Sequence, residues 1–144
     1  MTAGRHSPRI LDASALVELM HGHPTMMRLV SDADAGQAPL VVTALAALEA
    51  QAAIQVEPAL WEHILGLRGL IDMALSPRTA VDVAALAGPL LEGHPRHLPL
   101  YGAQMVAEVV HAAQQSTGVV VTRGPEAYRG FPVPVTELPD LPLP

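Results

Sequence analysis

The stretch Ile10-Leu11-Asp12-Ala13-Ser14 indicates how this chain folds, because two apolar residues lead into an acid that is followed by a helix-like segment. This pattern predicts a short buried strand that delivers one carboxylate, Asp12, to its carboxyl end. In open parallel sheets, ligands bind at the carboxyl ends of the strands. We therefore expect Asp12 to lie in a site, and the next question is which other residues meet it there.

The apolar composition describes the kind of core that the chain builds. Half of its 144 residues are apolar, but only 3% are aromatic and 15% are charged. Ala, Leu and Val must therefore form the core, which suits helices packed on a small sheet. The length fits a single domain spanning residues 1–144. The charged fraction lies below the usual quarter, and this favours an extensive buried or self-associating surface.

The balance of charge argues against a nucleic-acid-binding surface on the chain as a whole. The sequence has 8 arginines, no lysine and 14 acidic residues, for a net charge of -6. No basic run occurs, so the electrostatic footprint of a nucleic-acid-binding protein is absent. Folding can still bring arginines together locally.

Cysteine usage and the chain ends bear on location. There is no cysteine, which excludes disulfides and thiolate metal sites. We expect residues 1–8 to be a flexible N-terminus without a signal peptide, and residues 139–144 to be a Pro-rich tail. No apolar stretch is long enough to span a membrane, so we expect a cytoplasmic protein.

Strand-like and helix-like segments alternate along the chain. We expect strands at residues 9–13, 39–42, 79–83, 119–122 and 131–135. We expect helices at residues 15–21, 24–35, 44–56, 61–73, 84–91 and 101–115, with Ser14 and Thr43 as N-caps. Prolines at positions 132 and 134 favour an edge position for the last strand. The alternation predicts a parallel α/β sheet with helices on both faces.

Four stretches together resemble the PIN domain family, in particular VapC-type toxins. They are the segment around Asp12, the segment 43–50 with Glu49, the segment 97–103 before the long helix, and the segment 119–128. The resemblance implies a three-layer α/β/α fold with a central, mostly parallel sheet of about five strands. It also implies a Mg²⁺- or Mn²⁺-dependent endoribonuclease, the toxin of a toxin–antitoxin pair, which forms homodimers and binds an antitoxin.

The resemblance assigns the site residues one by one, and two of the expected acids are missing. Asp12 and Glu49 match the first two acids of the family, but glycines, Gly102 and Gly124, stand where the family has aspartates. Glu126 lies two residues beyond Gly124 and is a substitute ligand that could reach the site. Two further residues, Ser14 and Thr122, are expected to line the same pocket.

The absence of two of the expected acids leads to two functional hypotheses. The first is a PIN-like protein with a degenerate site, weakly active or inactive, that binds no ion and acts by binding or self-association. The alternative is an active Mg²⁺-dependent ribonuclease toxin that uses Asp12, Glu49 and Glu126 and that binds RNA. Hard divalent ions need several oxygen ligands, so the two glycines favour the first hypothesis.

Each candidate also has a purely structural interpretation. Asp12 can cap the following helix, and Glu49, on an apolar helix face, can pair with Arg123. Thr122 can serve as a hydrogen-bonding residue at a strand end. The pair His21 and His23, together with His94 and His97, could suggest zinc, but ordinary surface histidines fit this spacing better.

Overall fold

A computed structural model describes residues 7–93 and 100–141 of the chain. Its centre is a five-stranded sheet in the order β3-β2-β1-β4-β5, in which all neighbouring strands are parallel. The strands are β1 (Arg9–Leu11), β2 (Leu40–Thr43), β3 (Leu70–Met73), β4 (Val119–Thr122) and β5 (Val135–Glu137). The predicted parallel sheet is thus confirmed.

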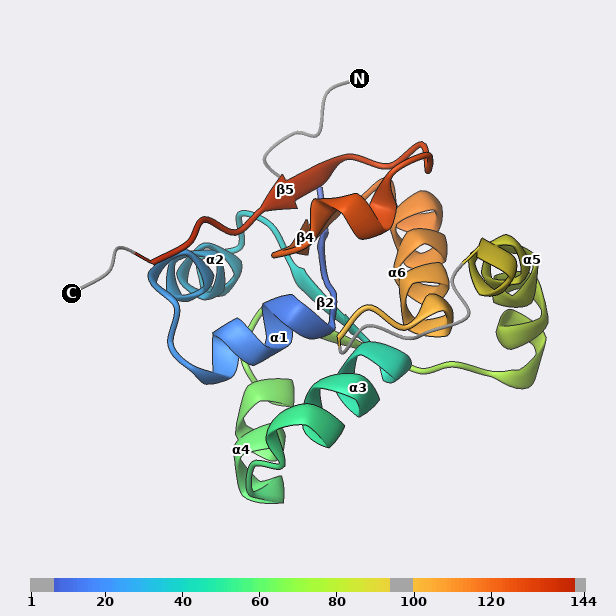
Figure 1. The fold of residues 1–144 in the computed structure, drawn as a ribbon. Coiled ribbons are helices and arrows are strands. Elements are labelled where there is room, and N and C mark those ends of the chain that lie inside the picture. Colours follow the sequence, from blue (N-terminus) through green and yellow to red (C-terminus); the bar gives the residue numbers. More distant parts are fainter. Residues whose placement is uncertain (1–6, 94–99, 142–144) are drawn as a thin grey trace.

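Helices cover both faces of this sheet. The described residues form α1 (Ala13–Met20), α2 (Pro24–Asp34), α3 (Ala44–Ile54), α4 (Pro58–Leu65), α5 (Pro77–Gly93), α6 (Ala103–Ser116) and a short 3-10 helix, η1 (Pro125–Tyr128). Figure 1 shows α1 and α2 on one side of the sheet and α6, with α5 beyond it, on the other. The three-layer α/β/α fold is therefore confirmed.

The three central strands are buried on both faces, as expected of strands between two helical layers. Ile10, Leu11, Val41, Val120 and Val121 are each no more than 1% exposed. Their short aliphatic and β-branched side chains leave room for α1 and α6 to pack closely on the two faces. This rigid centre places the carboxyl ends of β1 and β4 side by side, with Leu11 paired with Val121.

The expected strand at residues 79–83 is wrong, because this segment lies inside α5. Ser76 and Pro77 start the helix: the Ser76 hydroxyl oxygen accepts a hydrogen bond of 3.1 Å from the Thr79 amide. Pro77 at the first helical position has its φ angle preset for a helix. The helix-start signals at Ser76 and Pro77 therefore outweigh the strand propensity of the β-branched residues in this segment.

The third strand instead lies at β3, inside the helix expected at residues 61–73, which ends earlier, at Leu65. Gly69 makes this turn, with a φ of +82° and a backbone so close to Ala33 that a Cβ would lie 2.3 Å from its carbonyl oxygen. Only glycine fits this approach. The following four residues then pair with β2.

The last strand begins four residues later than expected, at Val135, and the residues of the expected strand at 131–134 precede it. Proline lacks the amide hydrogen that a strand interior needs, but the Pro134 carbonyl accepts a hydrogen bond from Val120. The predicted edge position is confirmed, since β5 pairs with β4 alone. Beyond β5, Leu138 is buried and its amide donates to the Thr122 carbonyl.

Candidate functional site

Asp12 lies directly after β1 and is fully buried. Its Oδ1 accepts hydrogen bonds from the Ser14 hydroxyl at 2.6 Å and from the Ala15 amide at 2.9 Å. Asp12 is therefore the N-cap of α1, as its structural interpretation predicts, and the expectation that Ser14 caps the helix is wrong. The helix begins immediately after the strand, so Ser14 is already inside its first turn.

The second oxygen of Asp12 is bound by a residue to which no role in the site was assigned from the sequence. The Tyr128 hydroxyl, at the end of η1, donates a hydrogen bond of 2.9 Å to Oδ2. Tyr128 is itself buried, with 2% of its surface exposed. Burial raises the pKa of Tyr128 well above its usual value, and the negative charge of Asp12 raises it further. At neutral pH this hydroxyl is a neutral donor held against the carboxylate.

Ser14 and Thr122 extend the hydrogen bonds around Asp12, and their side chains lie 3.2 Å apart. Ser14 gives its single hydroxyl hydrogen to Asp12, and hydrogen bonding by the Thr122 side chain also lowers the pKa of Asp12. Thr122 accepts in turn from the Gly124 amide at 3.0 Å. The structural interpretation of Thr122, a hydrogen-bonding residue at a strand end, fits this geometry.

Burial dominates the electrostatics of Asp12. It raises the pKa of the Asp12 carboxyl above its usual value, although hydrogen bonding by Ser14, Thr122, Ala15 and Tyr128 acts in the opposite direction. A buried carboxylate is tolerated when its lone pairs are matched by donors. Asp12 meets this condition with donors supplied by the protein itself.

Tyr101 is the second tyrosine at this site, and it covers Gly124. A Cβ atom placed on Gly124 would lie 2.7 Å from the ring carbon Cζ and 2.9 Å from the hydroxyl oxygen of Tyr101. Burial raises the pKa of Tyr101, and its polar neighbours include Ser14, Thr122 and Asp12. The chain contains only two tyrosines, and both lie at this one site.

Glu49 lies half-buried on α3 and reaches the start of α6. Its Oε2 accepts a hydrogen bond of 3.3 Å from the amide of Gly102, which is the N-cap of α6. A carboxylate at a helix N-terminus is favoured by the helix dipole. The charge of Glu49 also contributes to the raised pKa of Tyr128, so the two predicted acids lie near the same tyrosine.

The fold can now be compared with solved structures, since neither a protein-family model nor a curated protein matches the sequence significantly. A chain from a toxin–antitoxin complex of Klebsiella pneumoniae is similar at 18% identity and a TM-score of 0.58, with 90% of this chain and 99% of that chain covered. A chain from VapBC2 of Rickettsia felis, crystallised with a promoter DNA fragment, gives 12% identity and a TM-score of 0.63, with 92% and 99% covered. This chain has a VapC-type PIN-like fold. At these identities the likeness concerns the fold.

Within the PIN-like fold, Glu126 and Tyr128 share η1 but differ in placement. The Glu126 side chain is exposed, whereas Tyr128 is buried against Asp12. The short helix therefore places the Tyr128 hydroxyl, and not the Glu126 carboxylate, beside Asp12. Among the described residues, no group of three or more histidines and acids is arranged to hold a metal ion.

Arg123 lies beside the Asp12 site, because its backbone amide donates to the Ser14 oxygen at 2.9 Å. Its guanidinium forms ion pairs with Glu18, at 2.9 Å, and with Asp140. The hydrogen bond to Glu18 and the other contacts with these acids raise the pKa of Arg123. In the described part of the chain, Arg123 thus pairs with these two acids rather than with Glu49.

A buried acid on α6, Glu108, was missed by the sequence interpretation. Its Oε1 accepts a hydrogen bond of 2.7 Å from the Leu45 amide at the start of α3. Thr43 is the N-cap residue of α3 as predicted, but its side chain makes no capping hydrogen bond. Glu108 supplies the capping acceptor from a neighbouring helix, and burial raises its pKa. The sequence signal for this buried role is that Glu108 is the one acidic residue in the largely apolar α6.

His23 is not the surface histidine that its spacing suggested, since it is only 2% exposed. Its Nδ1 accepts from the Thr25 amide at 3.1 Å and caps α2, and its Nε2 lies 2.9 Å from the Pro139 carbonyl oxygen. A carbonyl only accepts, so Nε2 carries the hydrogen. His21 is exposed as expected, while His94 and His97 lie outside the described residues.

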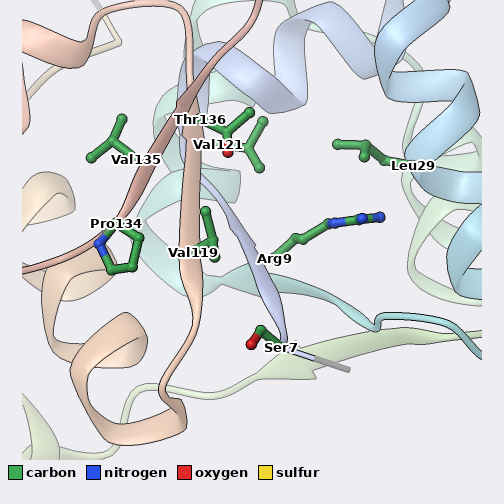
Figure 2. Close-up of a pocket in the computed structure, with 8 residues that line it drawn as sticks. All are labelled: Ser7, Arg9, Leu29, Val119, Val121, Pro134, Val135 and Thr136. Atoms are coloured by element: carbon green, nitrogen blue, oxygen red, sulfur yellow. The ribbon is translucent and has the colours of Figure 1, made fainter. Parts of the chain in front are cut away.

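A separate cavity of about 330 Å³ opens at the other end of the strands. Its lining residues come from the start of the chain, α2, β4 and β5, and they are Ser7, Arg9, Leu29, Val119, Val121, Pro134, Val135 and Thr136. Figure 2 shows Arg9 extending from β1 toward α2, where it pairs with Asp32 at 3.2 Å. The lining holds no carboxylate, so this cavity is not an alternative site for a hard cation.

Proposed function

We propose that this PIN-like protein is impaired as a metal-dependent ribonuclease and acts by binding or self-association. The observation that carries the proposal is that both carboxylate oxygens of Asp12 accept hydrogen bonds from the fold. A Mg²⁺ ligand must direct an oxygen lone pair at the ion, and Mg²⁺ requires near-octahedral geometry. Both lone pairs of Asp12 Oδ1 are taken, by Ser14 and Ala15, and one of the two lone pairs of Oδ2 is taken by Tyr128.

The charge around the pocket supports the same proposal. Metal-dependent hydrolysis of a phosphodiester needs positive charge near the phosphate, from an ion or from basic side chains. Of the described residues beside Asp12, Arg123 is a cation, and it is already paired with two acids, Glu18 and Asp140. The net charge of -6 adds a further unfavourable field for RNA.

Metal and RNA experiments on the same preparations test the impaired activity. We expect no heat of Mg²⁺ or Mn²⁺ binding in calorimetry at millimolar concentrations, and no ion-dependent cleavage of a mixed RNA substrate. The variants Asp12→Asn and, as a control, Asp72→Asn on the exposed part of β3 should behave like the wild type in both assays. Ion-dependent cleavage that Asp12→Asn abolishes and Asp72→Asn retains would establish the alternative, an active ribonuclease toxin.

The outer face of α3 supports self-association. Ala44, Leu48 and Ala52 are spaced by four residues, so they lie along one face of the helix, and all three are exposed. Leu48 has 63% of its surface in contact with solvent. We propose a homodimer in which this face is covered, in a protein that works in the cytoplasm.

Light scattering on a concentration series tests the homodimer. We expect a dimer for the wild type and a shift to monomer for Leu48→Asp. Val81→Asp is the matched control, because Val81 is an apolar residue on α5 that is 73% exposed. A wild-type monomer at high concentration, or equal effects of both variants, would contradict the proposed interface.

An antitoxin-type partner is the second binding mode that we propose. The two similar structures described above are toxin–antitoxin complexes. Co-expression with the product of the adjacent gene, followed by size-exclusion chromatography, tests it. A stable complex of defined stoichiometry is expected, and separate elution of the two proteins would count against this partner.

A further inference from the structure

We infer that Tyr101 and Tyr128 replace the divalent ion of a PIN-like pocket, one by filling ligand space and the other by binding Asp12. Restoring carboxylates at Gly102 and Gly124 alone then fails to rebuild a metal site. This inference rests on the proposed loss of metal-dependent activity and names the side chains responsible for it. It also explains how the pocket remains folded without an ion.

The first part of the inference is steric. A Cβ on Gly124 would lie 2.7, 2.8 and 2.9 Å from the Cζ, Cε1 and hydroxyl oxygen of Tyr101. Carbon atoms in contact prefer about 3.5–4.0 Å, so even a methyl group at this position collides with the ring. An aspartate side chain is larger still. No side chain can enter at position 124 until Tyr101 moves.

The second part concerns the hydrogen bond from Tyr128 to Asp12. A divalent ion would require an Asp12 oxygen as ligand, yet Oδ1 already accepts two hydrogen bonds and the Tyr128 hydroxyl, at 2.9 Å, takes one of the two lone pairs of Oδ2. Tyr128 cannot easily turn away, because its ring is among the largest fully buried side chains of the described chain. The phenol also offers Asp12 a neutral donor and so partly compensates its charge, which an ion would otherwise balance.

The backbone before Tyr101 supports a fixed placement of its ring. Leu100 has a φ of +71°, in the left-handed region that side chains other than glycine seldom adopt. Such a residue persists where the surrounding structure over-determines it. Tyr101 follows immediately and directs its ring over Gly124, which is itself held by the Thr122 hydroxyl oxygen.

The test compares Mn²⁺ binding by four folded forms of the full chain. They are the wild type; Gly102→Asp/Gly124→Asp; the same pair with Tyr101→Ala and Tyr128→Phe; and Tyr101→Ala/Tyr128→Phe alone as the control. Circular dichroism checks that each form is folded, and calorimetry together with Mn²⁺ electron paramagnetic resonance measures binding. We expect the quadruple variant to bind Mn²⁺ at least tenfold more tightly than either double variant.

Two outcomes would overturn the inference. One is a Gly102→Asp/Gly124→Asp variant that binds Mn²⁺ as tightly as the quadruple variant, since the tyrosines would then exclude nothing. The other is a folded quadruple variant that binds no Mn²⁺. Failure of the proposed function is distinguishable from both, because it appears as Mn²⁺ binding and RNA cleavage by the wild type.

Discussion

The hydroxyl of Tyr128 donates a hydrogen bond of 2.9 Å to Oδ2 of Asp12, a residue 116 positions earlier in the chain. The bond joins the short helix after β4 to the end of β1, at the centre of the sheet. It also completes the set of donors around a fully buried carboxylate. The acid expected to hold a metal ion is thereby built into the hydrogen bonds of the fold.

Tyr128→Phe removes the donor and leaves Oδ2 of Asp12 buried without it. A buried polar group that loses its partner costs about 1–3 kcal/mol, and we expect the free energy of unfolding to fall by this amount. Urea denaturation measures the change. In a double-mutant cycle, Asp12→Asn should reduce the effect of Tyr128→Phe, whereas simple additivity would show that the two side chains are not coupled.

The dependence of stability on pH follows from Asp12 and Glu108, whose pKa values burial raises above the ordinary 3.8 and 4.5. The folded state then holds these protons at a higher pH than the unfolded state. The contribution of both groups to stability therefore increases as pH falls through the raised values, and it levels off below about pH 4. Asp12→Asn should remove its share of this gain in urea denaturation between neutral pH and pH 4. Asp72→Asn, at an exposed acid, should leave the slope unchanged, and equal slopes for all three proteins would contradict the prediction.

Gly124→Ala should destabilise the fold by about 1–3 kcal/mol, the usual range for an overpacked site. The reason is the contact of the added methyl group with the Tyr101 ring. Tyr101→Ala in the same chain provides the matched test, because it removes the ring that causes the clash. The cost of Gly124→Ala, measured by denaturation, should be much smaller in this background. An undiminished cost would assign it to another neighbour.

Leu138, just beyond β5, is predicted to be part of the core rather than of a loose tail. It is 2% exposed, whereas Leu141, three residues later, is 53% exposed. Leu138→Ala should lower the free energy of unfolding by about 2–5 kcal/mol, as for other buried leucines. Leu141→Ala should change it by less than about 0.5 kcal/mol. Similar small effects for both variants would mean that the segment does not pack as described.

His23 and His21 offer a matched pair of histidines for the start of α2. His23→Ala removes the helix cap to Thr25 and the hydrogen bond to Pro139, so we expect a loss of about 1–3 kcal/mol. His21→Ala, at an exposed position, should be near neutral. Hydrogen exchange of the Thr25 amide should accelerate only in His23→Ala, and unchanged exchange would refute the capping role.

The parts of the fold that the sequence predicted best are those whose local pattern agrees with their tertiary surroundings. β1 and β4 are short aliphatic runs that the sheet buries on both faces, so composition and burial indicate the same element. β3 was missed because Leu70–Met73 includes the polar Asp72 and because the prediction placed Gly66 and Gly69 inside one continuous helix. Its identity as a strand comes from pairing with β2, which no local pattern reports.

The sequence predicted which acids the candidate site contains and which acids it lacks. It did not predict that two tyrosines occupy the site. Asp12, Glu49, Gly102 and Gly124 were chosen by their order along the chain, and the fold brings the two acids near Tyr128. Both tyrosines lie in stretches that carry the resemblance, but a sequence does not state which side chain fills the space above a glycine. That information resides in distances between segments far apart in the chain.

The central position of β1 has a consequence for how the protein emerges from the ribosome. β1 pairs with β2 and with β4, and the phenol that binds Asp12 follows 116 residues later. At about 5–20 residues per second, one edge of β1 stays open and Asp12 lacks its donor from Tyr128 for on the order of ten seconds. The middle of the sheet can close only after β4 has been synthesised. Premature termination before β4 would therefore release a chain with an open strand edge, which is a species prone to aggregation and to proteolysis.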